Sequence, residues 1–256
     1  MTPARPIEST SLGLVDELAL LPVPTVQQYV AAASEYVRAA RTLTASQAKT
    51  SQIRLSDALG KALLAELKAR LPAIGDGAIA GEREVAGALR SAQVDVSETH
   101  RLDGLRLAVE LKPVNLAVGR AIWNRFGDIR MTAVNLHLKF PFAVVGGVLA
   151  IPSYEMTPKG VKKSTTHLIA RAINRLERAG GRRTEGDAAH LLEGVGVLVY
   201  DPDTGAIDDD LPPRTSMVRW KTLWMPWSRH TGPDSSSLES LLVRTHDRRD
   251  RADRSG

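Results

Sequence analysis

The sequence of 256 residues contains no cysteine, which excludes disulfide bonds and thiolate metal sites and favours an intracellular location. The first ten residues, MTPARPIEST, have no apolar stretch behind a basic patch, so no secretory signal is expected. Long hydrophobic runs are also missing. The longest apolar stretch without a charge, residues 140–154, contains two prolines and two glycines and is too short to span a bilayer. Together these absences predict a soluble, cytoplasmic protein.

Positive charge is in slight excess, since Lys and Arg number 34 while Asp and Glu number 29. A net charge of +5 is common and by itself indicates little about partners. Residues 157–183 are more informative, because a single acid, Glu177, stands there among eight basic residues: Lys159, Lys162, Lys163, Arg171, Arg175, Arg178, Arg182 and Arg183. Such a segment forms either a solvated helix face or a phosphate-binding surface, and the sequence leaves both interpretations open.

Hydrophobic periodicity predicts an α/β protein with helices in front of its core. We expect helices over residues 26–42, 54–71, 82–91, 117–138 and 163–179, with Ser56 or Asp57 as the N-cap of the second. We expect two strands within residues 93–115, a buried strand at 142–152, and a strand at 193–205 that ends in a turn. The chain then divides into an N-terminal helical region (1–75), a core (76–230) and a partly disordered tail (231–256).

Residues 93–115, QVDVSETHRLDGLRLAVELKPVN, contain two alternating apolar runs joined by Asp103-Gly104, a pair that favours tight turns. If the chain reverses there, residues whose numbers sum to about 205 face each other. Asp95 then lies opposite Glu110, with Cβ atoms about 4.5–5.5 Å apart. The two-residue period of a strand places Lys112 on the same face as Glu110 and leaves Asp103 at the tip of the hairpin.

The same period predicts where the apolar side chains of the hairpin lie. Val94 and Val96 should share one face of the first strand, opposite to the face that carries Asp95. Leu107, Val109 and Leu111 should share one face of the second strand. The charged side chains would therefore gather on the other face of that strand.

Two carboxylates at this separation repel each other by about 4 kcal/mol at an effective dielectric constant near 20. A raised pKa on one acid or a bound divalent cation would offset the repulsion, and oxygen ligands without His or Cys favour Mg²⁺ or Mn²⁺. Lys112 adds a cation that suits a phosphate and an attacking water, so the pattern predicts metal-assisted phosphodiester hydrolysis. The alternative is an exposed hairpin in which Asp95, Glu110 and Lys112 form ordinary cross-strand pairs. A slipped register would bring Asp103 into the pocket instead of Asp95.

Asp95, followed after fourteen residues by Glu110-Leu111-Lys112, resembles the D…(D/E)-x-K signature of the PD-(D/E)XK nuclease superfamily. The resemblance covers residues 80–200 and implies a restriction-endonuclease-like core, in which helix, strand, strand, strand, helix and strand build a central mixed sheet flanked by helices. Residues 1–75 would then be a helical extension. The resemblance also implies that Asp95 and Glu110 ligate Mg²⁺ and that Lys112 positions or activates the water.

Many members of this superfamily place a glutamate on the helix that precedes these strands. Glu82 matches that position, because it would share a helical face with Val85 and Leu89 while Glu84 points away. The proline that some members carry before the aspartate is absent, and Val94 stands in its place.

The activity that the resemblance implies is a metal-dependent endonuclease acting on duplex DNA. A chain with extra helices resembles a type II restriction endonuclease, which is commonly a homodimer. A DNA repair or recombination nuclease, and a catalytically silent nucleic-acid-binding module of the same fold, are the alternatives. The Gln-x-x-x-Tyr helix expected of the helicase-linked repair nucleases does not follow Lys112. We expect four basic residues to contact DNA phosphates: Lys162, Lys163, Arg171 and Arg175.

The histidines and the tryptophan-rich segment can each be interpreted as structural or as functional. The histidines show no metal-ligand spacing, and we expect His137 and His167 to be structural or surface residues. The segment Trp220–Trp227 either packs its tryptophans in the core or stacks them on bases, and packing is the favoured interpretation.

Overall fold

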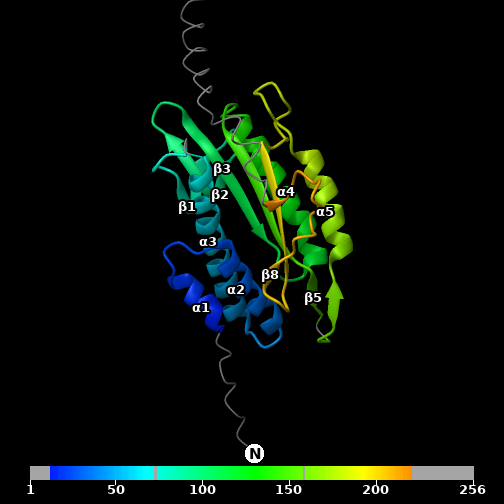
Figure 1. Ribbon diagram of the computed structural model, residues 1–256. Helices are drawn as coiled ribbons and strands as arrows, with labels where there is room; N and C mark the ends of the chain where they lie inside the picture. Colours follow the sequence, from blue (N-terminus) through cyan, green and yellow to red (C-terminus); the bar gives the residue numbers. More distant parts are fainter. Residues whose placement is uncertain (1–11, 72–73, 158, 221–256) are drawn as a thin grey trace, which may run out of the picture.

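A six-stranded mixed sheet lies between two layers of helices in the computed structural model, which describes residues 12–71, 74–157 and 159–220 (Figure 1). One layer contains α1 (Gly13–Leu20), α2 (Val26–Ala39) and α3 (Ala45–Arg70), and the other contains α4 (Val118–His137) and α5 (Thr166–Ala179). The sheet order is β1 (Ile79–Ala86), β2 (Ser91–His100), β3 (Gly104–Pro113), β4 (Val144–Pro152), β7 (Gly194–Asp201) and β8 (Ala206–Ile207). A separate pair, β5 (Tyr154–Met156) and β6 (Lys162–Ser164), lies outside it. The predicted α/β class is confirmed.

Strand directions follow from the connections. β1, β2 and β3 are joined by short turns and pair antiparallel. β3, β4 and β7 pair in parallel, since α4 and α5 supply the crossovers that parallel neighbours need. β4 and β7 are almost fully buried, which explains why their sequences are continuous apolar runs. From α3 to β4 the element order is helix, strand, strand, strand, helix, strand.

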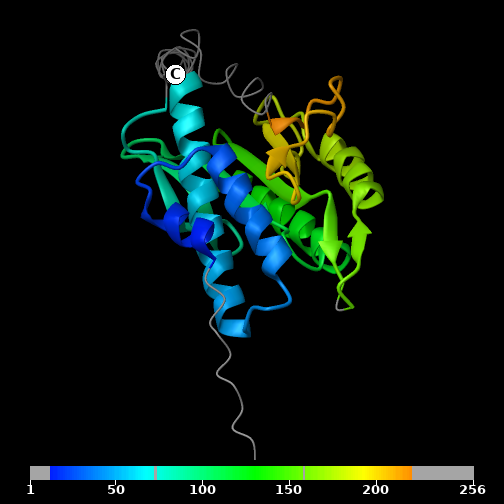
Figure 2. The same cartoon turned by 60° about the horizontal axis from the view of Figure 1, so that its bottom comes forward.

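Each face of the sheet has its own hydrophobic cluster (Figures 1 and 2). The first cluster joins α1, α2 and α3 to the sheet and includes Tyr29, Leu59, Leu63, Val109 and Leu111. The second joins α4 and α5 to the opposite face and includes Val118, Ile122, Ile129, Ile169 and Leu176. Residues 12–71 therefore share a core with the sheet, so α3 can form part of a site built on the strands.

Three helix boundaries differ from the sequence prediction by three residues or more, and the first is the end of α2, at Ala39 rather than residue 42. α3 begins at Ala45 rather than near residue 54, because Thr44 and Gln47 form a capping box: Thr44 Oγ1 accepts from Gln47 N at 3.3 Å, and Gln47 Oε1 accepts from Thr44 N at 2.9 Å. α5 begins at Thr166, three residues after the predicted start, because Lys162 and Lys163 belong to β6. α1 was not predicted.

The helix predicted at residues 82–91 is wrong, because this segment contains β1 and the turn to β2. β1 is an edge strand with one buried side chain, Val85, so it lacks the alternating apolar pattern that identifies a half-buried strand. The turn is anchored on Asn135 of α4, whose Oδ1 accepts from Leu89 N at 2.8 Å and whose Nδ2 donates to Arg90 O at 2.8 Å. Hydrogen bonding to β2 and the contacts with Asn135 therefore decide the structure of this segment, although its apolar residues have the spacing of a helix.

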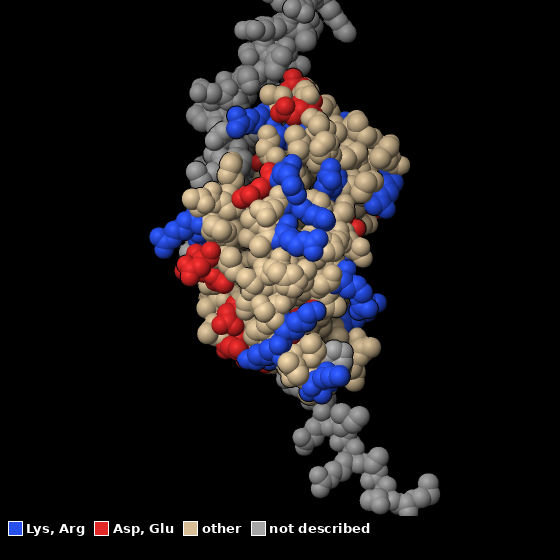
Figure 3. Space-filling model, turned by 90° about the vertical axis from the view of Figure 1, so that its right-hand side faces the viewer, with Lys and Arg blue, Asp and Glu red and all other residues tan. Residues whose placement is uncertain are grey.

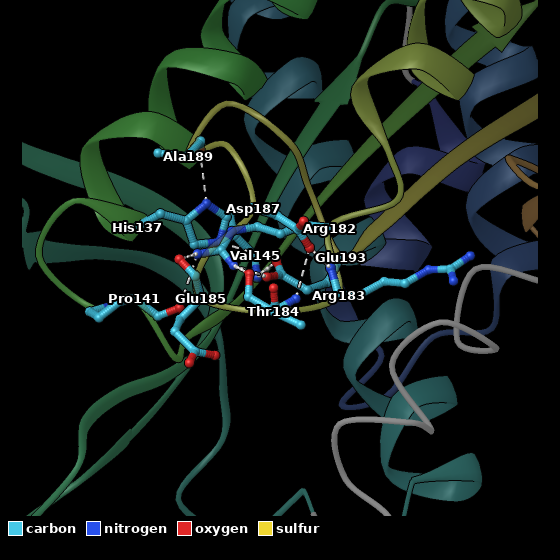
Figure 4. A network of polar contacts seen from close by, with 10 residues as sticks. All are labelled: His137, Pro141, Val145, Arg182, Arg183, Thr184, Glu185, Asp187, Ala189 and Glu193. Atoms are coloured by element: carbon cyan, nitrogen blue, oxygen red, sulfur yellow. Dashed lines mark hydrogen bonds and ion pairs between the residues drawn. The ribbon is translucent and has the colours of Figure 1, made fainter.

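A buried polar network holds the segment between α5 and β7 against the start of β4 (Figure 4). His137 contacts Glu193 Oε2 through Nε2 at 3.1 Å and the carbonyl of Ala189 through Nδ1 at 3.0 Å. Glu193 Oε2 also accepts from Val145 N at 2.8 Å, and Arg182 donates to Pro141 O at 3.1 Å. His137 is therefore a structural residue, as predicted, whereas His167 is exposed on α5.

Candidate active site

The register of the β2–β3 hairpin confirms the predicted pairing. Val96 pairs with Val109 and Ser97 with Ala108, so the paired residue numbers nearest Asp95 sum to 205; a register shift after Glu98 lowers the sum to 204 beside the turn. The next position brings Asp95 beside the segment of β3 that carries Glu110. Asp95 Oδ2 accepts a hydrogen bond from the backbone N–H of Leu111 at 2.6 Å, which holds the carboxylate against β3.

A β-bulge in β1 lies opposite Asp95. Ala80 pairs with Val96 and Arg83 with Val94, so both Gly81 and Glu82 face the single residue Asp95. Gly81 has a φ of 115°, a conformation that glycine adopts without the strain imposed by a Cβ atom. A bulge bends its strand and redirects a side chain, and here it places Glu82 on the wall of a cleft that Asp95 also lines.

Two expectations are corrected at this bulge. Glu82 reaches the cleft from a strand, not from a helix. Val94 packs in the second hydrophobic cluster and Val96 in the first, so the two valines do not share a face. The alternation of β2 breaks at Asp95, because the strand bends there with its bulged neighbour. β3 stays regular, and Leu107, Val109 and Leu111 share the predicted face.

Glu110 and Lys112 form an ion pair at this cleft: Lys112 lines the cleft, and Glu110 lies below its surface. Lys112 Nζ contacts Glu110 Oε1, and the side chains are 20% and 6% exposed for Lys112 and Glu110 respectively. The second carboxylate oxygen, Glu110 Oε2, is buried and has no hydrogen-bond partner among the described residues. An unpaired buried carboxylate oxygen is costly, which makes Glu110 Oε2 a candidate ligand atom.

α4 packs closely over this part of the sheet. Gly147 of β4 is the parallel neighbour of Glu110, and a Cβ atom on Gly147 would lie 2.4 Å from Ile129 of α4. The absence of a side chain at Gly147 therefore allows α4 to approach the strands. This approach brings the carboxylate of Asp128 close enough to affect the ionisation of Glu110.

The cleft has a volume of about 790 Å³ and lies between α3, α4 and the strands. Asp95 and Lys112 line it directly, whereas Glu110 lies below its surface. Other polar residues that line it lie on α3, on β1, on α4 and after β3: Lys49, Gln52, Arg54, Ser56, Asp57, Glu82, Arg125 and Asn115. The α3 and α4 residues have no distinguishing signal in the sequence, because on a helix they resemble an ordinary solvated face.

Burial shifts the ionisation of both central acids. Burial raises the pKa of Glu110 from 4.5 to about 7; Lys112 opposes this rise, and the negative charges of Asp95 and Asp128 add to it. Burial also raises the pKa of Asp95, where the Leu111 N–H and Lys112 oppose the rise. Carboxylates held in a cleft with raised pKa values are typical of functional sites.

Asp95 and Glu110 are the two candidate ligands for a hard divalent cation with few protein ligands. Among residues 12–71, 74–157 and 159–220, no group of three or more His, Asp or Glu side chains could hold a metal ion. Mg²⁺ is usually bound by one or two carboxylates, with waters and substrate phosphates completing its shell. Asp95 and the unpartnered Oε2 of Glu110 match that donor set.

Asp103 lies far from these residues. Its carboxylate is 3.2 Å from His100 Nδ1 at the exposed turn, and Gly104 beside it has a φ of 73°. Five strand steps separate Asp95 from His100, where β2 ends and the turn begins, which corresponds to about 16 Å. Asp95 is therefore the aspartate beside Glu110, and Asp103 is a turn residue.

The four basic residues predicted to contact DNA form two separate pairs, and none of them lines the cleft. Lys162 on β6 donates to Asp203 Oδ1 at 2.7 Å, and Lys163 lies 3.7 Å from Glu155. Arg171 and Arg175 lie on α5, where both guanidinium groups contact the ring of Trp123. The two lysines are therefore compensated by acids, whereas no acid among the described residues forms an ion pair with the two arginines.

Only part of the tryptophan segment can be placed. Trp220 is buried in the first hydrophobic cluster, which confirms packing at this position. Residues 221–227 and the tail predicted at 231–256 lie outside the described residues. Within the described ranges, no helix has the length and apolar character needed to cross a membrane.

Comparisons with known proteins give no match from which a role for these residues could be inferred. No protein-family model matches the chain, and searches of curated proteins and of solved structures return no match.

Proposed function

We propose that this protein is a Mg²⁺-dependent endonuclease that hydrolyses phosphodiester bonds in duplex DNA, with a core of the PD-(D/E)XK kind. One observation carries the proposal: Asp95 and Lys112 line one cleft, and Glu110 lies below its surface, paired with Lys112 and with one buried oxygen that has no partner among the described residues. A purely structural ion pair would need neither the second carboxylate nor the cleft.

The element order supports this assignment. The PD-(D/E)XK resemblance implies a core of helix, strand, strand, strand, helix and strand, and α3 to β4 follow that order. The acids lie on the second and third of these strands, as the signature requires. α3 takes the place of the core helix that the sequence had assigned to residues 82–91.

Each side chain has a distinct role in the proposed reaction. Asp95 and Glu110 would hold Mg²⁺, which when bound polarises a phosphoryl oxygen and lowers the pKa of a bound water. The Leu111 N–H fixes the orientation of the Asp95 carboxylate. Lys112 provides a cation at the cleft surface, where it can orient the attacking water and stabilise the charge that develops on the phosphate.

Glu82 adds a third acid to the wall of the cleft. It is exposed on the bulge, and its negative charge adds to the raised pKa of Asp95. An acid in this place could accept a proton from a water in the cleft.

Cleavage should require a divalent cation. Mg²⁺ and Mn²⁺ are expected to support hydrolysis of plasmid DNA, whereas Ca²⁺ should allow binding without turnover. The physical reason is that the buried carboxylate of Glu110 and the half-buried carboxylate of Asp95 repel each other unless a cation neutralises them. Gel analysis of plasmid DNA with each ion, and with excess EDTA, measures this. Robust cleavage in EDTA would contradict the proposal.

Lys112→Ala is expected to abolish cleavage while preserving metal binding. Lys112 contacts Glu110 Oε1 and leaves Oε2 available, so its removal should not take away a metal ligand. Calorimetric titration with Mn²⁺ and a cleavage assay on the same preparation separate the two functions. Lys139→Ala, which removes an exposed lysine that does not line the cleft, is the matched control and should remain active. Loss of Mn²⁺ binding in Lys112→Ala would reject the role given to the lysine.

Within this function, we propose a type II restriction endonuclease, which would act as a homodimer. A repair or recombination nuclease is the alternative enzyme. A catalytically silent DNA-binding module is favoured by one observation, because Lys112 already neutralises one carboxylate in the absence of a cation. The cleavage assay distinguishes this module from an enzyme.

A further inference from the structure

We propose that the outer surface of α5 is a second binding site for the nucleic-acid backbone, separate from the cleft. We call it the basic face; it consists of Trp123, Arg171, Arg175 and Arg178. The inference rests on the proposed function only for the choice of DNA as the ligand, since the contacts that carry it are independent of the carboxylates.

Trp123 holds two arginines in place. The guanidinium carbon of Arg175 lies 4.1 Å from the centre of the Trp123 ring, and that of Arg171 lies 5.0 Å away. A guanidinium plane that stacks on an aromatic ring keeps its N–H edge available for phosphate oxygens. The ring therefore orients the donors without neutralising them.

The three arginines repel each other and have no acidic partner. In the part of the chain that the structure describes, no carboxylate forms an ion pair with Arg171, Arg175 or Arg178. Glu177, the single acid of the segment, accepts a hydrogen bond from Ser216 at 2.6 Å. Like charges at three- and four-residue spacing destabilise a helix, so their retention favours an anionic partner.

The basic face is hollowed and clustered. Arg171, Arg175 and Arg178 line a depression of about 510 Å³ together with Asn174 and Glu177. Figure 3, which views the molecule from the side of α5, shows a group of Lys and Arg side chains in the middle of this surface. The arginines span seven residues, or about 10 Å of helix. A duplex carries one negative charge per about 1.7 Å of its axis, so several phosphates fall within that length.

α4 separates the basic face from the cleft. Ala121 and Arg125 line the cleft, whereas Trp123 packs against α5. Each helical residue turns by about 100°, so Trp123 points about 200° away from either neighbour. The two surfaces therefore lie on opposite sides of one helix, and a bound nucleic acid would reach the basic face with a segment that is not in the cleft.

A nucleic acid suits the basic face better than the other anionic partners. Two longer parts of this chain lie beyond the described residues: 221–256 contains seven Lys and Arg residues against five Asp and Glu residues, and 1–11 contains one Arg and one Glu, so the charge of neither part complements the arginines. An acidic peptide presents isolated carboxylates, whereas stacked guanidinium groups match the regular phosphate oxygens of a backbone.

The test uses the full-length Asp95→Asn chain, so that binding is measured without cleavage, with a labelled 30-base-pair duplex as the probe. The pair Arg171→Ala/Arg175→Ala is compared with Arg101→Ala/Lys139→Ala. The control pair also removes two exposed charges, and Lys139 also lies over an aromatic ring, 5.5 Å from that of Phe140. Fluorescence anisotropy over a salt series gives the affinity and its salt dependence.

The basic-face pair should weaken binding about tenfold or more, and the slope of log affinity against log salt should fall by about 1.8, or 0.9 for each lost phosphate contact. The control pair should leave the slope unchanged. Trp123→Leu should weaken binding with the slope retained, because the charges remain. Arg175→Lys tests the same point if Trp123→Leu does not fold, since lysine keeps the charge and loses the planar stack.

Equal slopes in the two pairs would overturn the inference. So would binding of polyglutamate as tight as that of duplex DNA, because the partner would then be an acidic peptide. A wild-type chain that never cleaves DNA, yet binds it through the basic face, would reject the proposed nuclease and support this second site.

Discussion

Asp95→Asn is expected to abolish DNA cleavage, with a loss of at least about 100-fold in rate, while the fold remains intact. Asparagine keeps the shape of the side chain, and its Oδ1 can still accept from the Leu111 N–H that binds Asp95 at 2.6 Å. The change removes one of the two negative charges that would hold the cation. Cleavage of plasmid DNA and thermal unfolding of the same sample measure the two effects.

Asp103→Asn is the matched control for this experiment. Asp103 is exposed at the hairpin turn, where asparagine before glycine serves the same geometry. We expect wild-type cleavage and a similar unfolding temperature. An inactive Asp103→Asn beside an active Asp95→Asn would show that the assignment of the two aspartates is wrong.

Glu110→Gln is expected to abolish cleavage and at the same time to stabilise the protein at alkaline pH. The pKa of Glu110 is raised from 4.5 to about 7, so between these values the folded state binds more protons than the unfolded state. Stability therefore falls as pH rises through this window, and above it the cost of the buried charge is about 3 kcal/mol, at about 1.36 kcal/mol per pH unit. The attraction of Lys112 is included, because it lowers the pKa that burial alone would produce.

Urea unfolding in EDTA at pH 5 and pH 8 measures this effect. The variant should be close to the wild type at pH 5 and more stable at pH 8, since glutamine stays neutral. Glu84→Gln, at an exposed position of β1, should change stability by less than about 0.5 kcal/mol at either pH. A Glu110→Gln protein that is less stable than the wild type at pH 8 would make Glu110 a structural residue.

The hairpin and its pairing could be predicted because local signals agree. Asp103-Gly104 sets the turn, and the apolar alternation of β3 sets the face, so Asp95 is brought to Glu110 without reference to the rest of the chain. The depth of burial could not be predicted in this way. It depends on α4, which approaches Glu110 because Gly147 of a distant strand has no side chain.

The errors in the sequence prediction lie where tertiary contacts decide the structure. β1 was assigned as a helix, since one buried side chain, Val85, is too weak a pattern for a strand. The sequence predicts Glu82 at the site as a residue of a helix, yet Glu82 lies on a strand and reaches the cleft through the bulge at Gly81. The sequence does not predict that Lys49 of α3 lines the cleft, because α3 packs on the sheet through residues far apart in the sequence.

The bulge of β1 also bears on how copies of this chain can assemble. β1 is an outer strand of the sheet, and an open strand edge invites another chain to continue its backbone hydrogen bonds. Here that edge is interrupted at Gly81 and carries the exposed charges of Glu82, Arg83 and Glu84. Bulges and charges both obstruct such strand addition, and β8 at the opposite edge is two residues long. A homodimer should therefore associate through helices or loops, and its two sheets should remain separate.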